Sequence, residues 1–108
     1  FGDARQIVPS FPNNSFDLIF QDVDKRLYPV LLKDCIRILK TGGILIADDA
    51  LFPTMELDQK WNNQVEPMSE FNCLIAAAVD MESTLLPIGD GMIVAVKKES
   101  YFKHNHFV

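Results

Sequence analysis

Two short and nearly unbroken apolar runs stand out along the chain, at residues 16–20 (FDLIF) and 44–47 (ILIA). Runs of this kind are typical of strands that are covered on both faces, as in parallel sheets. Between them, apolar residues recur at helical spacing: Leu27, Val30, Leu31, Cys35, Ile38 and Leu39. Asp24 is placed to cap the start of this helix, and Gly42 and Gly43 are placed to end it. The pattern therefore predicts a β-α-β unit with two parallel strands.

The second half of the chain predicts a loop, a helix and a hairpin. The stretch after Pro53, MELDQKWNNQVEP, is polar and has no apolar period, which predicts a long loop over the strand ends. A helix is expected from about Ser69 to about Asp80, and its apolar stripe has five members: Phe71, Leu74, Ile75, Ala78 and Val79. The segments STLLPI and MIVAV flank a Gly-Asp-Gly turn at residues 89–91, which predicts an antiparallel hairpin.

The pattern as a whole predicts an α/β fold. Residues 4–8 are expected to form a short helical turn before the first strand. Two parallel strands with a crossover helix follow, and then a helix and an antiparallel hairpin. The predicted domain covers residues 1–98, and residues 99–108 form a tail.

Composition supports one packed domain and narrows the possible partners. The chain has 108 residues, of which 48% are hydrophobic and 10% aromatic, and this excludes a disordered chain. A net charge of -5 with scattered Lys and Arg argues against nucleic-acid binding. Small-molecule or protein partners are favoured instead. No apolar run approaches the roughly 18 residues that a membrane span needs, and FGDARQ has no part of a signal peptide, so we expect a cytoplasmic protein without a membrane partner.

The two cysteines are expected to be buried thiols rather than a bonded pair. Cys35 and Cys73 each fall on the apolar stripe of a predicted helix. A thiol in such a position usually behaves as a small hydrophobe. A disulfide or a metal-binding pair is the less favoured alternative.

Acidic residues follow both apolar strands. Asp22, Asp24 and Lys25 lie in QDVDK, and Asp48 and Asp49 lie in ADDALF. Because the carboxyl ends of parallel strands meet at one edge of a sheet, these carboxylates are expected to come together, as in a metal-assisted active site.

Each of these residues also has a structural interpretation. For Asp24 we favour an N-cap over a ligand. Asp48 and Asp49 could instead accept hydrogen bonds from loop backbone, and the residues alone leave both interpretations open. Lys25 could be an ordinary solvated lysine at a helix start.

Four segments together resemble a known family. GDA (residues 2–4), FDLIFQDVDK, LKTGGILIADDALF and LLPIGDGMIVAVKK occur in the order and at about the spacing of S-adenosylmethionine-dependent, divalent-metal O-methyltransferases, a family that includes catechol and caffeoyl-CoA O-methyltransferases. The resemblance extends to Lys98. It implies a Rossmann-like methyltransferase sheet, of which this chain holds the C-terminal portion with the last four strands. The glycine-rich cofactor turn and the ribose-binding acid of the family do not occur in these 108 residues, so the chain alone is expected to be inactive.

The resemblance also implies roles for individual residues. Asp22, Asp48 and Asp49 match the ligands of a metal ion, with Mg²⁺ as the first choice and Mn²⁺ or Ca²⁺ as alternatives. Asp49 stands where the family most often has Asn. Lys25 matches the general base, and Asp22 would also lie close to the transferring methyl group.

Five positions match cofactor contacts of the family: Asp3, Ala4, Asp22, Val23 and Tyr28. For Asp3 and Ala4 the alternative is an ordinary strand-to-helix turn, and Tyr28 could simply pack at the surface. Phe52 and Trp61 could wall the acceptor pocket, or pack on their own loop. Asp90 is interpreted as a hairpin residue.

The predicted function is metal-assisted methyl transfer from S-adenosylmethionine to a hydroxyl of a small catechol-like acceptor. The main alternative is a non-catalytic remnant or assembly module of the same fold. A metal-binding fold with another ligand is a third and less favoured interpretation. The strand at residues 16–20 is expected to have an open apolar edge, which a homo-oligomer would cover. His104 and His106 alternate in the tail, where a flexible or interface role is favoured over metal binding.

Overall fold

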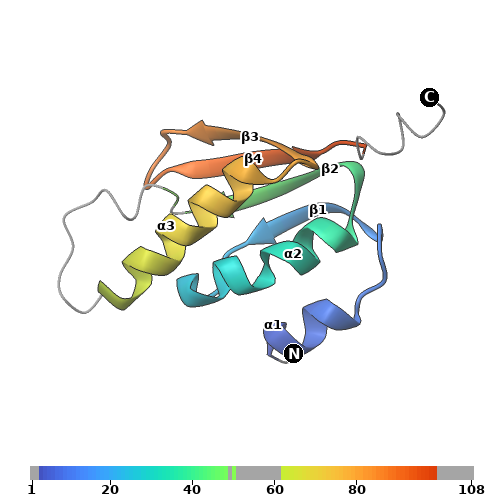
Figure 1. Cartoon of the computed structure of the whole chain (residues 1–108), viewed down its shortest axis with the longest axis horizontal. Helices are drawn as coiled ribbons and strands as arrows, with labels where there is room; N and C mark the ends of the chain where they lie inside the picture. Colours follow the sequence, from blue (N-terminus) through green and yellow to red (C-terminus); the bar gives the residue numbers. More distant parts are fainter. Residues whose placement is uncertain (1–2, 49, 51–61, 100–108) are drawn as a thin grey trace.

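Four strands form one mixed sheet in the order β1-β2-β4-β3 (Figure 1). The computed structural model describes residues 3–48, 50 and 62–99. The expected roles of Asp49, Phe52 and Trp61, and the tail from residue 100 onward, therefore lie outside the described residues.

The first two strands form the predicted β-α-β unit. β1 (Phe16–Gln21) and β2 (Leu39–Asp48) are parallel neighbours, and α2 (Tyr28–Ile38) connects them. A single 3-10 turn, η2 (Lys25–Leu27), leads into α2. The parallel arrangement brings the carboxyl ends of β1 and β2 to the same edge of the sheet.

The two glycines after α2 do not end the helix, as the sequence had suggested. α2 ends at Ile38, and β2 is ten residues long and contains both glycines. The β1–β2 register shifts between the pairs Phe16–Leu39 and Leu18–Ile44, so β2 has extra residues at this point. Gly42 has a φ of 85°, which favours glycine, and it allows the chain to bend within the strand.

The predicted hairpin is confirmed. β3 (Met81–Leu86) and β4 (Met92–Lys97) are antiparallel neighbours, and β4 also pairs with β2 in the antiparallel sense. Gly89 and Gly91 in the turn have φ values of 56° and 88°, a conformation that residues with a Cβ rarely adopt.

The second long helix starts earlier than predicted. α3 runs over Asn62–Ala77 and includes Pro67, whereas the sequence placed residues up to this proline in a loop. A proline inside a helix removes one main-chain hydrogen bond. The residues before Pro67 are mostly polar, so the sequence shows no apolar helical period there. Packing offsets this loss, because Met68 beside the proline is fully buried.

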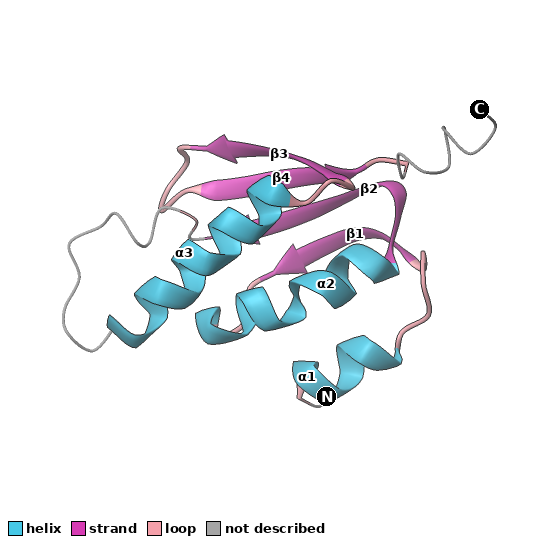
Figure 2. Ribbon diagram, in the orientation of Figure 1, coloured by secondary structure: helices cyan, strands magenta, loops and turns pink. Residues whose placement is uncertain are grey.

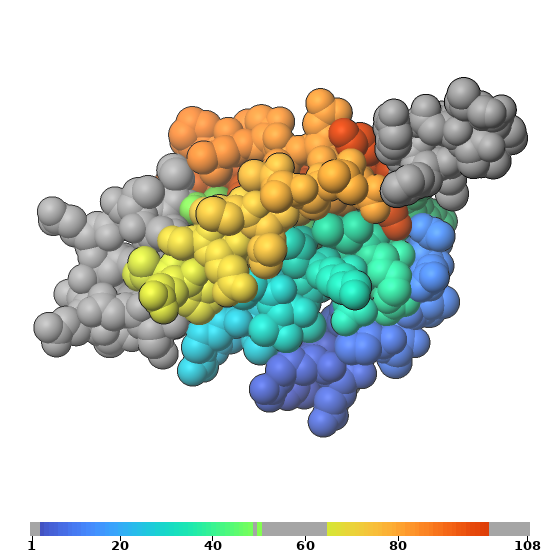
Figure 3. All heavy atoms as spheres, viewed as in Figure 1, coloured from blue at the N-terminus to red at the C-terminus, as the bar shows by residue number. Residues whose placement is uncertain are grey.

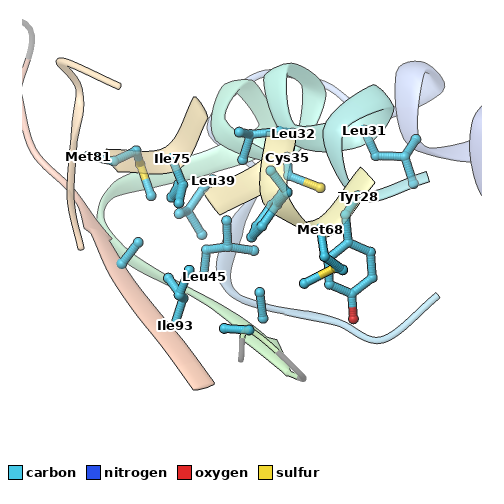
Figure 4. Close-up of a cluster of buried hydrophobic side chains, with 14 residues drawn as sticks. Tyr28, Leu31, Leu32, Cys35, Leu39, Leu45, Met68, Ile75, Met81 and Ile93 are labelled. Atoms are coloured by element: carbon cyan, nitrogen blue, oxygen red, sulfur yellow. The ribbon is translucent and has the colours of Figure 1, made fainter. Parts of the chain in front are cut away.

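Helices α2 and α3 pack against each other on one face of the sheet (Figures 1 and 2). A space-filling view from the helix side shows the two helices covering this face (Figure 3). Their inward side chains meet Leu45 and Ile93 of the central strands (Figure 4). The core consists of these residues: Tyr28, Leu31, Leu32, Cys35, Leu39, Leu45, Ala47, Ala50, Met68, Phe71, Ile75, Met81, Ile93 and Ala95.

Four residues expected on the buried stripes are exposed instead. They are Val30, Cys73, Leu74 and Val79. Val79 is exposed because α3 ends at Ala77, before the expected end near Asp80, and leaves this valine in the turn that follows. For the other three residues, the stripe on the helix is narrower than the periodicity suggested, because each helix meets the core only along its line of contact with the sheet and the other helix. Cys35 is buried as expected, and both cysteines are free thiols. Within the described residues, no helix is long and apolar enough to cross a membrane.

The N-terminal segment forms α1 (Ala4–Ile7) and the 3-10 turn η1 (Val8–Ser10), which confirms the predicted helical turn. The segment that follows η1 is held by hydrogen bonds from Arg37 of α2. Its guanidinium donates to the main-chain oxygen of Phe11 at 2.8 Å and to Oδ1 of Asn13 at 2.7 Å.

Candidate active site

The register of the parallel pair brings two of the predicted ligand positions together. Gln21 of β1 lies beside Ala47 of β2. Asp22 directly follows the end of β1, and Asp48 is the last residue of β2; neighbouring strands lie about 4.8 Å apart in a sheet. Asp22 is exposed and Asp48 is half-buried at the end of β2. The two carboxylates therefore share the carboxyl-end edge of the sheet, where open α/β folds place their ligands.

The described residues supply two of the three predicted metal ligands. Within residues 3–48, 50 and 62–99, no group of three His, Cys, Asp or Glu could hold a metal ion. Two adjacent carboxylates do fit a hard divalent cation, which takes oxygen ligands and keeps several waters when the protein offers few. The donor set thus suits Mg²⁺, while Asp49 lies outside the described residues.

A reciprocal pair of hydrogen bonds fixes the turn that carries Asp22 and Lys25. The Tyr28 hydroxyl donates to the main-chain oxygen of Gln21 at 2.7 Å, and the Gln21 side-chain amide donates to the main-chain oxygen of Tyr28 at 3.3 Å. Gln21 is 4% exposed and Tyr28 is fully buried, with its ring edge-on to Phe71. The alternative that Tyr28 packs at the surface is wrong. Its contact with a cofactor stays a prediction.

Asp24 caps η2, as the sequence favoured. Its carboxylate accepts from the main-chain N–H of Arg26 at 2.9 Å and forms an ion pair with the guanidinium of the same residue at 2.5 Å. The side-chain hydrogen bond from Arg26, followed by the main-chain one, lowers the Asp24 pKa to about 2. This cap starts the 3-10 turn at Lys25, which is half-buried and lies three residues after Asp22.

The N-terminal turn repeats this arrangement. Asp3 caps α1 by accepting from the main-chain N–H of Arg5 at 2.9 Å, and it forms an ion pair with the Arg5 guanidinium at 2.7 Å. The side-chain hydrogen bond from Arg5 lowers the Asp3 pKa. A helix-starting turn is thus what the structure shows at Asp3 and Ala4, and their adenine contact stays a prediction.

One hollow joins the two capped turns. It has a volume of about 340 Å³ and is lined by Arg5, Asp24, Arg26 and Leu27. The hollow lies between the two segments in which cofactor contacts were predicted, near Asp3 and near Val23. Val23 is half-buried and packs against the core, so its position also has a structural cause.

A link from α3 holds the chain just beyond Asp48. The Asn72 side-chain amide donates to the main-chain oxygen of Ala50 at 2.8 Å, and the Ala50 N–H donates to the oxygen of Gly91 at 3.1 Å. Ala50 is 2% exposed. The segment that carries Asp48 is thereby attached both to α3 and to the β3–β4 turn.

Sequence reasoning missed Gln21 and Asn72. Both are polar residues in otherwise apolar surroundings, Gln21 at the end of an apolar strand and Asn72 directly after the core residue Phe71. A polar residue inside a buried pattern is a signal that could have drawn attention to them, because buried polar groups need partners.

Solved structures define the class to which this fold belongs. A Corynebacterium glutamicum protein superposes with a TM-score of 0.79 at 22% identity, over 93% of this chain and 47% of its own. The SAH-bound methyltransferase of Podospora anserina gives 0.79 at 22% identity, over 91% of this chain and 47% of its own. The fold is that of the C-terminal portion of a Rossmann-like methyltransferase.

Sequence comparison gives the family. The O-methyltransferase family profile matches residues 1–98. A candidate O-methyltransferase of Mycobacterium sp. (strain JLS) is 29% identical over 97 residues, which are 89% of this chain and 44% of the relative. The chain belongs to the O-methyltransferase family, and it spans a little less than half the length of the relatives that it matches.

Proposed function

We propose that this chain carries the metal-binding and proton-accepting side of an S-adenosylmethionine-dependent O-methyltransferase that acts on a small catechol-like hydroxyl compound. The observation that carries the proposal is the register of the two parallel strands, which pairs Gln21 with Ala47, the residues directly before Asp22 and Asp48. Lys25 lies on the turn that follows β1. A solved neighbour supports the cofactor, because the crystal structure of an O-methyltransferase from Bacillus cereus, 25% identical to this chain, contains SAH.

The residues of the site would divide the work of methyl transfer. Asp22 and Asp48, with Asp49 as the third predicted ligand, would hold a divalent cation such as Mg²⁺, which lowers the pKa of a bound hydroxyl. Lys25 would accept the hydroxyl proton at Nζ. The acceptor oxygen then attacks the methyl carbon, the bond from that carbon to sulfur breaks, and S-adenosylhomocysteine leaves as a neutral thioether.

The neighbouring hydrogen bonds would keep these groups in place. The Gln21–Tyr28 pair fixes the main chain directly before Asp22, and the Asp24 cap fixes the turn that presents Lys25. A preorganised site avoids the cost of ordering its groups during the reaction.

A metal titration tests the first step of this proposal. Mn²⁺ binding to the 108-residue chain would be measured by electron paramagnetic resonance for the wild type, Asp22→Asn, Asp48→Asn and Asp17→Asn. Asp17 lies at the opposite end of β1 and its side chain is 85% exposed, which makes it the matched control. We expect Asp22→Asn and Asp48→Asn each to weaken binding at least tenfold, and Asp17→Asn to leave it unchanged. Equal binding by all four chains would reject the metal site.

A non-catalytic remnant or assembly module is the second candidate. These 108 residues contain no glycine-rich cofactor turn, so cofactor binding by these residues alone is the property that distinguishes the two functions. Calorimetric titration of S-adenosylmethionine into the chain with Mg²⁺ present separates the two functions. Micromolar binding would support a rebuilt cofactor site, whereas no heat would mean that these residues alone do not form one.

A further inference from the structure

A hollow lies between α3 and the β3–β4 hairpin, and its volume is about 280 Å³. We call it the α3–β3 hollow. Three elements line it, and the residues used below are Asn72, Ile75 and Ala76 of α3, Ser83 and Leu85 of β3, and Ile93 of β4. None of these residues belongs to the candidate active site.

The α3–β3 hollow is on the face of the sheet that the helices cover. Leu85 pairs with Ile93, which belongs to the core beneath the helices, and residues paired across antiparallel strands lie on the same face. Leu85 is nevertheless 49% exposed, against 6% for Ile93. The helix layer therefore covers β4 more completely than β3, and the hollow lies where the cover ends.

The hollow is separate from the candidate metal ligands. Ala47 belongs to the core, and Asp48 is the next residue of β2. Because successive side chains of a strand point to opposite faces, Asp48 lies on the face away from the helices and from the hollow. A molecule in the α3–β3 hollow would therefore not be in contact with the Asp48 carboxylate.

The lining suits a small uncharged molecule with an apolar body. Ile75 is 1% exposed and Ile93 is 6% exposed, so both present buried apolar surface. Among the described residues, no acidic or basic side chain lines the hollow, and a charged ligand would lose its hydration without gaining a partner. An apolar cavity of about 150 Å³ is enough to bind benzene, so this hollow has room for one ring with a substituent.

Two polar side chains in the lining would orient such a molecule. The Asn72 amide nitrogen donates to the main-chain oxygen of Ala50, whereas its Oδ1 is buried and has no hydrogen-bond partner within the described part of the chain. A buried acceptor without a donor is unfavourable. Ser83 adds a hydroxyl, which both donates and accepts. A ligand with a hydroxyl group would supply the donor that Asn72 lacks.

We propose that the α3–β3 hollow binds a small uncharged molecule with an apolar ring and a hydroxyl group, and that this hydroxyl donates to Asn72 Oδ1. The same amide holds Ala50, two residues after Asp48. A bound molecule would order the amide and thereby hold the chain beyond Asp48 more firmly. The coupling is reciprocal, because ordering of this chain would strengthen binding by the same factor.

Titration of benzyl alcohol into the 108-residue chain, followed through amide chemical shifts by NMR, tests the binding. Benzoate is the matched probe, because it has the same ring but carries a charge. Ala76→Phe fills the hollow, and the control Ala77→Phe places the same ring at an exposed neighbouring position outside the lining. Thermal unfolding of each variant checks the fold.

We expect saturable shifts at Asn72 and Ser83 of the wild type, with a dissociation constant of about 1 mM or lower for benzyl alcohol. Ala77→Phe should bind equally well. Affinity should fall by about tenfold or more in Ala76→Phe, and for benzoate in the wild type. Equal affinity of the two variants, or of the two probes, would overturn the proposal. Shifts confined to Phe16 and Leu18, which line a second hollow, would also overturn it.

Hydrogen exchange at Ala50 tests the link through Asn72. The Ala50 N–H is bonded to the oxygen of Gly91 and exchanges when this part of the chain opens. With benzyl alcohol at about ten times its dissociation constant, exchange should slow about tenfold in the wild type and stay unchanged in Asn72→Ala. Unchanged exchange in the wild type, or equal slowing in both chains, would overturn the link. Binding in the hollow needs no metal ion, so this proposal and the proposed metal site fail separately.

Discussion

The side-chain amide of Asn72 donates a hydrogen bond of 2.8 Å to the main-chain oxygen of Ala50. These two residues are 22 positions apart, and their contact joins the middle of α3 to the chain just after Asp48. The Ala50 N–H is bonded to Gly91 in turn. The acidic end of β2 is therefore positioned by two elements that come later in the sequence.

Removal of the Asn72 amide should loosen the chain beyond Asp48. Asn72→Ala leaves the Ala50 oxygen without this donor, and a lost hydrogen bond of this kind costs about 1 kcal/mol. We expect the free energy of unfolding in urea to fall by about that amount and the Ala50 amide to exchange faster with solvent. Cys73→Ala changes the exposed neighbour on the same helix and should alter neither quantity.

Tyr28→Phe tests the turn before Asp22. The variant keeps the ring that packs edge-on against Phe71 but loses the 2.7 Å hydrogen bond to the buried Gln21 oxygen. We expect a loss of about 1 to 3 kcal/mol in the free energy of unfolding, because a buried acceptor is left without its donor. An unchanged urea midpoint would show that the hydrogen bond adds nothing to stability.

Acid should weaken the Asp24 cap in a defined pH range. The Asp24 pKa lies at about 2 in the folded chain, below its ordinary value of 3.8, because Arg26 bonds the ionised form. A lowered folded-state pKa gives stability that is present above about pH 4 and is lost as the pH falls to about 2. Asp24→Asn can keep the cap without titrating.

We therefore expect the wild type to lose more stability than Asp24→Asn between pH 4 and pH 2. The difference should be small, because the Arg26 and Asp24 side chains are 58% and 37% exposed. Thermal unfolding across this pH range measures it, and parallel curves for the two chains would contradict the assignment.

The two thiols should differ in reactivity. Burial, followed by the nearby Asp34 charge, raises the Cys35 pKa to about 11, whereas Cys73 is exposed. We expect a disulfide reagent to modify one thiol quickly in the native chain and two in denaturant, since the thiolate is the reactive form. Cys73→Ser should abolish the fast phase. Two fast thiols in the native chain would show that the core around Cys35 opens readily.

Lys25→Ala tests the proposed proton acceptor in an active, full-length O-methyltransferase that contains this chain. Loss of a general base typically lowers turnover by about 10²- to 10⁴-fold, while the dissociation constant of S-adenosylmethionine should change little. The control is Lys33→Ala, an exposed lysine on α2. Equal losses in turnover and cofactor affinity would assign Lys25 to positioning instead.

The sequence predicted the structure best for elements that are determined by residues close together along the chain. The apolar run of β1, the period of α2 and the glycines of the β3–β4 turn each indicate a local structure, and all three elements are present. Only the end of α2 was wrong, since the helix stops at Ile38, before the two glycines. Asp24 belongs to the same group, because an N-cap acts within two residues of its own position.

Predictions failed where packing outweighed local preference. Gly42 and Gly43 resemble a helix stop, but they lie within β2, at the point where its register with β1 shifts. The polar residues up to Pro67 resemble a loop, but α3 begins at Asn62 and continues through the proline. Val30 and Val79 fit an apolar period, yet neither contacts the core closely enough to be buried.

Patterns along the chain were enough to predict the order of the elements, the family and the carboxylates that follow two strands, because each of these depends on residues that are near neighbours in the sequence. Tertiary contacts were needed to pair Gln21 with Ala47 at the ends of β1 and β2, to attach Asn72 to Ala50 and to leave Leu18 and Phe20 exposed. The reason is physical: strand register and helix packing are decided by contacts between distant segments, and a local pattern does not specify which distant segment will cover it.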